Sequence, residues 1–371
     1  MKENAEEILI SGAVPYGKPA AKTAKVLRVR LAVFALALCV IALGGCAGKA
    51  KLYIYNWTYY TPDSVIEKFE KEYNVRVIYD EFASNEDMYA KLKAGGSGYD
   101  IVFPSADYVS IMIQQNMLEK IDKTKIPNLK NVDPAVLRQA DYDPNMNYSV
   151  PYYFGAAGIA VNTAYVQNFK RSWSIFGRDD LSGRMTMLDD MREVMGDALA
   201  YLGYSVNTVD PAKIEEAKKL INNSWKPNLV KFDAEAFGKG YANGDFWVVQ
   251  GYPEVVFEEI ADNEQLKANT VFFIPEEGGP AYIDSMCILK GSKNIDVAHK
   301  FINFIHSPEI YAEFADIFGF PATANVPARN FKTGESWYTE AELANVEVKK
   351  DIGDDLELYN DAWFNSIKVV K

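Results

Sequence analysis

The chain has 371 residues, 49% hydrophobic and 24% charged, which is an ordinary globular composition but too long for one typical compact domain. Aspartate and glutamate number 51 against 39 lysines and arginines, giving a formal net charge of −12 at pH 7. This acidic balance argues against nucleic acid or anionic lipid surfaces as partners, because both are negatively charged.

The first 46 residues have the pattern of an export signal. Basic residues from Lys18 to Arg30 precede the apolar run "LAVFALALCVIAL" at 31–43, and small residues follow. A run of 13 apolar residues with these flanks is typical of a secretory signal and is too short to span a bilayer comfortably. Without residues 1–46 the chain keeps 33 basic and 48 acidic residues, a net charge of about −15 that favours cations as ligands, although acidic surfaces also serve solubility alone.

The motif "LGGC" at 43–46 resembles a bacterial lipobox, in which the cysteine is diacylated and becomes the mature N-terminus. It implies a lipoprotein signal peptide over 1–46 and a lipid anchor on Cys46 as the one membrane attachment. The alternatives are a plain signal peptide or a short anchor. We expect an exported, periplasmic, membrane-anchored lipoprotein in which Cys287 has no disulfide partner and is a buried thiol.

Predicted strands and helices alternate from residue 51 onward. Strands are expected within 51–57, 75–82, 99–105, 158–161, 183–190, 244–252, 270–279 and 281–291, and helices within 62–73, 84–95, 190–203, 210–223, 253–263 and 296–319. A repeated βα pattern favours parallel sheets with right-handed crossovers. The expected fold is α/β with two lobes, each a mainly parallel sheet flanked by helices, covering 51–155 plus 281–325 and 156–280 plus 326–371, with hinge crossings between them.

The stretch "LYIYNWTYYTP" at 52–62 places several aromatic rings where a strand gives way to a helix. Ligands bind at the carboxyl ends of strands in open α/β sheets. We therefore interpret these rings as part of a binding site.

Catalytic signatures are weak. His299 and His306 lie within helical patterns and are expected to be surface or helix-end residues. The sequence has no P-loop, no GxGxxG opening a helix, no GxSxG elbow and no metal-ligand spacing, so we predict no catalytic residue, cofactor or metal. A hydrolase that uses carboxylates alone stays open.

Acids next to rings form the most informative pattern. Tyr282 and Asp284 are two apart and so share one face of a strand, and Tyr252 precedes Glu254 by two. Asp190 and Glu193 stand at a helix start, where a capping box is the competing interpretation. Rings attract cations and carboxylates bind ammonium groups, so the set indicates a small organic polycation.

Six segments in order resemble the periplasmic spermidine/putrescine-binding proteins of polyamine ABC importers: "LYIYNWTYYTP", "SNEDMYAKLKAGGSGYDIVFPSADYV", "YSVPYYFGAAGIAVN", "DDMREV", "PEEGGPAYIDSM" and "FGFPATAN". The resemblance implies an interlobe cleft that boxes the methylenes of a polyamine with rings and holds its ammonium groups with acids. The implied rings are Trp57, Tyr60, Tyr252, Tyr282 and Phe320. The implied acids are Asp190, Glu193 and Asp284, and the implied polar lining is Thr58 and Ser105.

Four departures from the family pattern bear on specificity. Tyr59 replaces an acid, and Asp107, which we include in the site, replaces a tyrosine and restores a charge. Tyr252 replaces a tryptophan. Lys349 replaces an amide near the end of the cleft, and we expect it to point away from a polycation or to shorten the usable site.

The function implied is a receptor, not an enzyme, that captures putrescine, spermidine or both and delivers the ligand to an ABC transporter permease. Alternatives are a receptor for another small cationic solute, an iron complex, an amino acid or a sugar on the same fold, a carboxylate-dependent hydrolase, and a surface adhesin.

Overall fold

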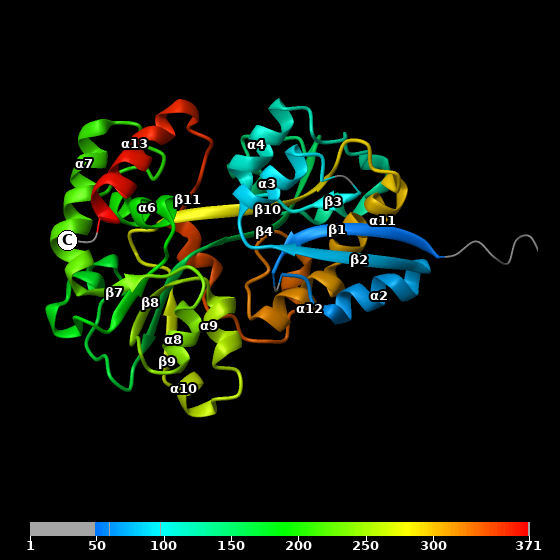
Figure 1. Cartoon of the computed structure of the whole chain (residues 1–371). Helices are drawn as coiled ribbons and strands as arrows, with labels where there is room; N and C mark the ends of the chain where they lie inside the picture. The colour runs from blue at the N-terminus through cyan, green and yellow to red at the C-terminus, as the bar shows by residue number, and fades with distance from the viewer. Residues whose placement is uncertain (1–48, 59, 97, 370–371) are drawn as a thin grey trace, which may run out of the picture. The chain divides into compact units, whose positions relative to one another are not determined.

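The computed structural model describes residues 49–58, 60–96 and 98–369 (Figure 1). The predicted signal peptide with Cys46, and Tyr59 in the aromatic stretch, lie outside the described residues. Residues 50–371 form one compact unit.

Strands and helices alternate through this unit, as the sequence pattern predicts. The strands are β1 (Ala50–Trp57), β2 (Val75–Phe82), β3 (Ile101–Val102), β4 (Ser149–Ala156), β5 (Gly158–Asn162), β6 (Met185–Met187), β7 (Leu229–Phe232), β8 (Val248–Gly251), β9 (Thr270–Phe273), β10 (Pro280–Ile288) and β11 (Glu347–Val348). The helices are α2 (Asp63–Tyr73), α3 (Asn85–Lys93), α4 (Ala106–Gln114), α5 (Pro134–Gln139), α6 (Met191–Tyr201), α7 (Pro211–Leu220), α8 (Phe237–Ala242), α9 (Pro253–Glu259), α10 (Glu264–Ala268), α11 (Ile295–Ile305), α12 (Pro308–Phe318) and α13 (Leu356–Ala362).

The strands form two separate sheets. The first has the order β11-β10-β3-β1-β2, with β4 also paired to β10, and the second has the order β7-β6-β8-β5-β9. Parallel pairs such as β1 with β2 and β6 with β8 follow from the βα crossovers. Antiparallel pairs, such as β10 with β4 and β5 with β9, make both sheets mixed.

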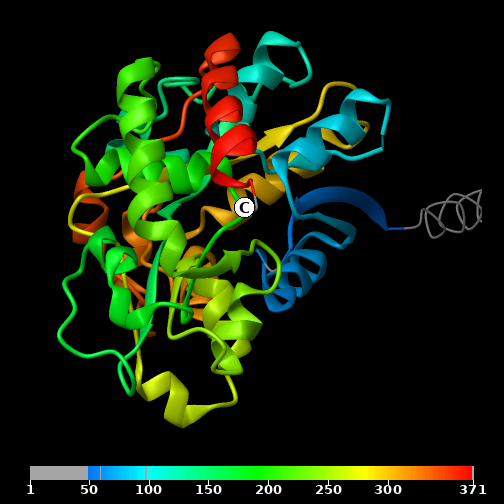
Figure 2. The same ribbon diagram turned by 60° about the vertical axis from the view of Figure 1, so that its left-hand side comes forward.

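Long strands connect the two sheets. β4 ends at Ala156 in the first sheet and β5 begins at Gly158 in the second, and the chain returns between β9 and β10. In Figure 1, β4 and β10 run between the two halves of the unit. β11 pairs with β10, whereas α13 a few residues later packs against α6 and α7 (Figure 2).

Local signals explain several element ends. Ser84 caps α3, its Oγ accepting the Asp87 N–H at 3.1 Å. Helix α2 ends at Asn74, whose φ of 51° is the left-handed conformation that stops a helix. Tyr282 on β10 stands opposite Gly155 on β4, where a Cβ would lie 2.7 Å from the Tyr282 hydroxyl. Gly155 therefore leaves room for the Tyr282 ring.

The prediction of surface or helix-end residues holds for His306 as a helix-end residue, whereas neither histidine lies on the surface. His299 is buried, with Nε2 accepting the Asp122 N–H at 2.8 Å, and His306 is buried at the end of α11. Burial lowers the pKa of His306 to about 4, so its ring is neutral. His306 Nε2 lies 2.9 Å from the Pro151 carbonyl oxygen, and its ring stacks on Tyr311 of α12.

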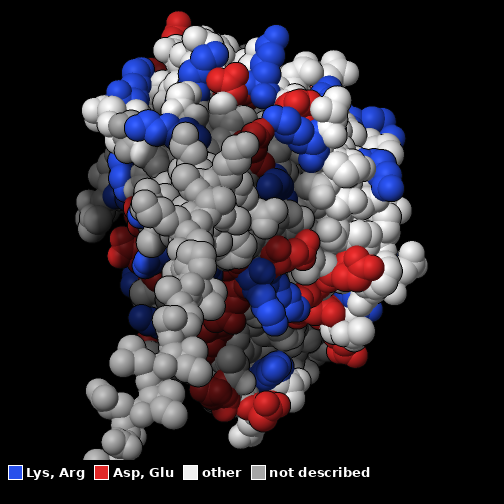
Figure 3. All heavy atoms as spheres, turned by 90° about the vertical axis from the view of Figure 1, so that its right-hand side faces the viewer, with Lys and Arg blue, Asp and Glu red and all other residues white. Residues whose placement is uncertain are grey.

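Cys287 is a free, buried thiol, as predicted. No helix within the described residues has the length and apolar character needed to cross a bilayer. On the face in Figure 3, lysine and arginine side chains are interspersed with acidic ones.

Candidate ligand-binding site

The aromatic stretch after β1 lies beside strand β10. Tyr60 is buried and its hydroxyl donates to Asp284 Oδ2 at 2.7 Å. Trp57 is half-buried, its Nε1 donates to the Phe103 carbonyl at 2.8 Å, and its ring lies 4.6 Å from that of Phe82. Thr58 is exposed. The strand end thus presents Tyr60 to a carboxylate while Trp57 is fixed in orientation by its indole N–H.

Asp284 is the centre of the first group. Ser105 Oγ donates to Asp284 Oδ1 at 2.6 Å, and a backbone bridge joins the two residues. Asn85 in turn contacts Ser105 through Nδ2, at 3.1 Å from Oγ. Burial raises the pKa of Asp284 to about 6, although the hydrogen bonds from Ser105 and Tyr60 oppose the shift. Asp284 is therefore a buried carboxylate whose hydrogen-bond partners are neutral hydroxyls.

Helix α6 supplies the second group. The Asp190 carboxylate accepts the Glu193 N–H at 3.0 Å and caps the helix, as one interpretation predicted. The Glu193 side chain does not complete a capping box: it accepts from the Tyr252 hydroxyl at 3.3 Å and pairs with Lys349. Capping the helix and pairing with Lys349 are thus separate roles of these two neighbouring acids.

Lys349 points toward these acids. Its ammonium pairs with Glu193, and its side chain is only 14% exposed. Burial disfavours the charged form, but Glu193, Asp190 and Asp107 outweigh burial and raise the pKa of Lys349 above its usual value. The expectation that Lys349 points away is wrong: pairing of β11 with β10 places its backbone beside the site, and Glu193 holds its ammonium. The expectation of a shortened site remains.

The remaining predicted residues surround these two groups. The Tyr252 and Tyr282 rings lie 5.8 Å apart, edge to face. Asp107 is half-buried at the start of α4. Burial raises its pKa, and the charge of Lys349 offsets part of this rise. Phe320 is fully buried and stacks on Tyr153 at 4.4 Å. Phe320 therefore supports the rings from within the core.

Two acids were missed as site residues. Glu254 opens α9 two residues after Tyr252, and its Oε2 is buried with no hydrogen-bond partner among the described residues. Burial, together with the charge of Asp284, raises the pKa of Glu254 to about 7. Asp197, four residues after Glu193 on α6, is fully buried with a strongly raised pKa, caused first by burial and then by Glu193. The spacing "YPE", noted in the sequence, was the available signal for Glu254.

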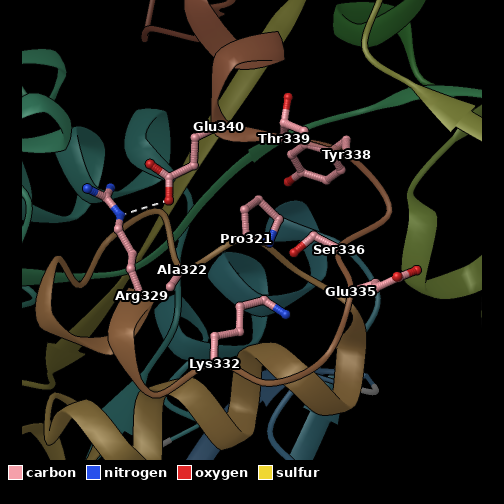
Figure 4. Close-up of a pocket in the computed structure, with 9 residues that line it drawn as sticks. All are labelled: Pro321, Ala322, Arg329, Lys332, Glu335, Ser336, Tyr338, Thr339 and Glu340. Atoms are coloured by element: carbon pink, nitrogen blue, oxygen red, sulfur yellow. Dashed lines mark ion pairs between the residues drawn. The ribbon is translucent and has the colours of Figure 1, made fainter.

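An open pocket of about 590 Å³ lies elsewhere, between the segments around Pro321 and Tyr338 (Figure 4). None of the predicted binding residues lines it. Its cations are already neutralised: Arg329 pairs with Asp133 and Glu340, and Lys332 pairs with Asp316. The carboxylate cluster is therefore the better candidate for recognition of a charged ligand.

The chain forms two mixed β-sheets with flanking helices, and crossing strands join the two sheets. Both halves contribute charged and aromatic groups to the candidate site. This is the architecture of a two-lobed binding protein. Residues 64–345 match the model of the bacterial extracellular solute-binding protein family, to which this chain belongs. The family binds solutes rather than transforming them.

The relatives are named for polyamines. The chain is 37% identical over 344 residues to the spermidine/putrescine-binding periplasmic protein of Salmonella typhimurium, covering 88% of this chain and 96% of that protein. The crystal structure of the TpPotD lipoprotein of Treponema pallidum matches with a TM-score of 0.82 and 52% identity, over 85% of this chain and 99% of that one. PotD of Streptococcus pneumoniae matches with a TM-score of 0.77 and 29% identity, over 85% and 98%. The predicted resemblance and the two-lobed α/β class are confirmed.

Proposed function

We propose that this protein is a receptor that captures a polyamine, putrescine or spermidine, between its lobes and delivers it to an ABC importer. The observation that carries the proposal is a cluster of buried carboxylates among tyrosine rings with one built-in cation, in a chain whose relatives are named for polyamines. Buried carboxylates without a counter-charge are costly, and ammonium groups on an apolar chain supply that charge.

The proposed ligand contacts come from both lobes, which we take to cover 51–155 plus 281–325 and 156–280 plus 326–371. The proposed rings and polar groups are Trp57, Thr58, Tyr60, Ser105, Tyr252 and Tyr282, with Phe320 supporting the rings from the core rather than touching the ligand. The proposed acids are Asp107, Asp190, Glu193 and Asp284, to which we add Glu254. Rings would pack on the methylenes while acids hold the ammonium groups.

The binding test is calorimetry of the full chain with putrescine and with spermidine. Charge-assisted hydrogen bonds at about 1.5–3 kcal/mol each and cation–π contacts at about 0.5–2 exceed the association cost enough for roughly micromolar binding. 4-Aminobutyrate, in which a carboxylate replaces one ammonium group, is the matched control and should not bind. Absence of heat and of a thermal shift with both polyamines at millimolar concentration would refute the proposal.

Delivery to a permease requires that the liganded state differ from the free one. Since the proposed ligand touches both lobes, it favours their approach through differential affinity. We expect the radius of gyration, measured by X-ray scattering, to shrink on saturation with ligand. Identical scattering curves with and without ligand would count against this delivery mechanism.

We also propose that residues 1–46 direct export and that Cys46 carries the lipid anchor. The "LGGC" motif supports this, as does the similarity to the T. pallidum protein, which is named a lipoprotein. In Triton X-114 partition of the protein made in a bacterial host, the natural chain should enter the detergent phase and the Cys46→Ser variant the aqueous phase. Aqueous partition of both would exclude the anchor.

A further inference from the structure

The position of Lys349 is set by the sheet rather than by its charge. β11 pairs in parallel with β10, placing Val348 opposite Ala281. The Lys349 backbone N–H then donates to the Ala281 carbonyl at 3.0 Å. This bond fixes the Lys349 backbone one residue after Val348, the sheet partner of Ala281, and next in register to Tyr282. The ammonium therefore reaches the site from a backbone that the sheet holds in place.

The charges around this ammonium are those that a cationic ligand would use. Lys349 forms an ion pair with Glu193, and it is close enough to Asp190 and Asp107 for their charges to favour its ionised form. Its charge also acts on Asp284. Lys349 thus stays charged, and it neutralises one acid at the α6 side of the site.

Asp284 and Glu254 lie outside helix α6, and neither forms an ion pair within the described part of the chain. Glu254 Oε2 also has no hydrogen-bond partner there. The two are close enough for their charges to interact. A diamine can place its two ammonium groups against these two acids, whereas a further ammonium directed at the α6 side would meet the like charge of Lys349 in a buried setting, where repulsion is strong.

We propose that Lys349 occupies one ammonium position of the site and is a specificity-determining residue that selects diamines over triamines. This inference rests on the proposed polyamine function and adds to it the size and charge of the ligand. In this arrangement the two ammonium groups of a diamine meet Asp284 and Glu254, while the third ammonium of spermidine competes with the lysine for the acids of α6.

The test compares putrescine and spermidine by calorimetry on the full chain, the Lys349→Gln variant and the Lys350→Gln variant. Glutamine keeps a hydrogen-bond donor for Glu193 but removes the charge. Lys350 is a matched control because its ammonium pairs at 2.6 Å with Asp141, and both side chains are about half exposed, at 49% and 57%.

We expect the natural chain to bind putrescine at least tenfold more tightly than spermidine. Lys349→Gln should shift the ratio of spermidine to putrescine affinity at least tenfold toward spermidine, and Lys350→Gln should leave the ratio unchanged. Equal affinities in the natural chain, or an unchanged ratio in Lys349→Gln, would overturn the inference while leaving the polyamine function intact. If neither amine binds the natural chain, the proposed function fails and the inference with it. The ratio of putrescine to spermidine affinity in the natural chain can be measured without a variant, so the inference can be tested even if Lys349→Gln does not fold.

Discussion

Asp284 and Glu193 are both buried carboxylates of the candidate site, yet their surroundings differ. Asp284 accepts hydrogen bonds from the hydroxyls of Tyr60 and Ser105, which carry no charge. Glu193 is paired with the ammonium of Lys349. A buried carboxylate without a counter-charge gains much from an incoming cation, whereas a paired one gains little. The contrast teaches that the same residue type can serve recognition at one position and internal neutralisation at another.

Removing the built-in cation should have the largest effect. Lys349→Met leaves Glu193 buried with the Tyr252 hydroxyl as its remaining side-chain partner, and should lower the free energy of unfolding of the ligand-free protein by about 3 kcal/mol. Urea denaturation measures this change. The double variant Lys349→Met/Glu193→Gln should recover most of the loss, because no unpaired charge remains. Equal losses in the single and double variants would show that packing of the lysine, and not charge, stabilises this end.

Asp284, the other carboxylate of this comparison, should control ligand affinity rather than stability. Asp284→Asn keeps the size of the side chain but removes its charge, and should weaken putrescine binding by about 10- to 100-fold in calorimetry. Asp141→Asn is the control, since Asp141 is an exposed acid that pairs with Lys350. Affinity within about threefold of the natural chain would place the ligand away from Asp284.

A fall in pH should change protein stability and ligand affinity in opposite directions. Glu254 and Asp284 have pKa values of about 7 and about 6 in the folded state, above the values near 4 of an unfolded chain. Between about pH 4 and 7 the folded state therefore holds more protons than the unfolded state, so the stability contribution of these groups rises as the pH falls. A cationic ligand needs the ionised carboxylates, so its affinity falls over the same range.

We expect putrescine to bind roughly tenfold or more weakly at pH 5.5 than at pH 7.5, measured by calorimetry. The Glu254→Gln variant should show a smaller pH dependence of both affinity and melting temperature. Affinity that is constant over this range would mean that neither acid meets the ligand's charge.

The smallest effect is expected at Tyr252. Its hydroxyl lies 3.3 Å from Glu193 Oε1, a long hydrogen bond to an acid that Lys349 already neutralises. Tyr252→Phe keeps the ring and should change putrescine affinity by about threefold or less, whereas Tyr252→Ala removes the ring and should weaken it further. A large loss with Phe would assign the hydroxyl, rather than the ring, to recognition.

Local patterns were enough to predict much of this fold. Strand β2 is the segment "VRVIYDEF" that alternation and its bounding residues indicate, and Ser84 and Asp190 cap the helices that follow them. The antiparallel pairing of β10 with β4 could not be read from the sequence, because their residues are more than 120 positions apart and pair through tertiary structure. The burial of His299 and His306 was missed for a similar reason, since a helical pattern does not show what packs against each face.

The site was predictable where ring and acid are neighbours in sequence and obscure where they are not. Tyr282 and Asp284 share a strand, so their proximity follows from its period of two. The partners of Asp284, in contrast, come from segments as distant as Tyr60. Lys349 was recognised as a departure, but its direction depends on β11, a two-residue strand with no clear signal in the sequence.

The pairing of β11 with β10 also has a consequence for biogenesis. Glu193 and its cation are 156 positions apart in the chain. A nascent chain synthesised up to residue 340 contains the other strands of both sheets but lacks Lys349, whose ammonium neutralises Glu193 on helix α6. A chain that has not yet reached Lys349 therefore carries Glu193 without its counter-charge.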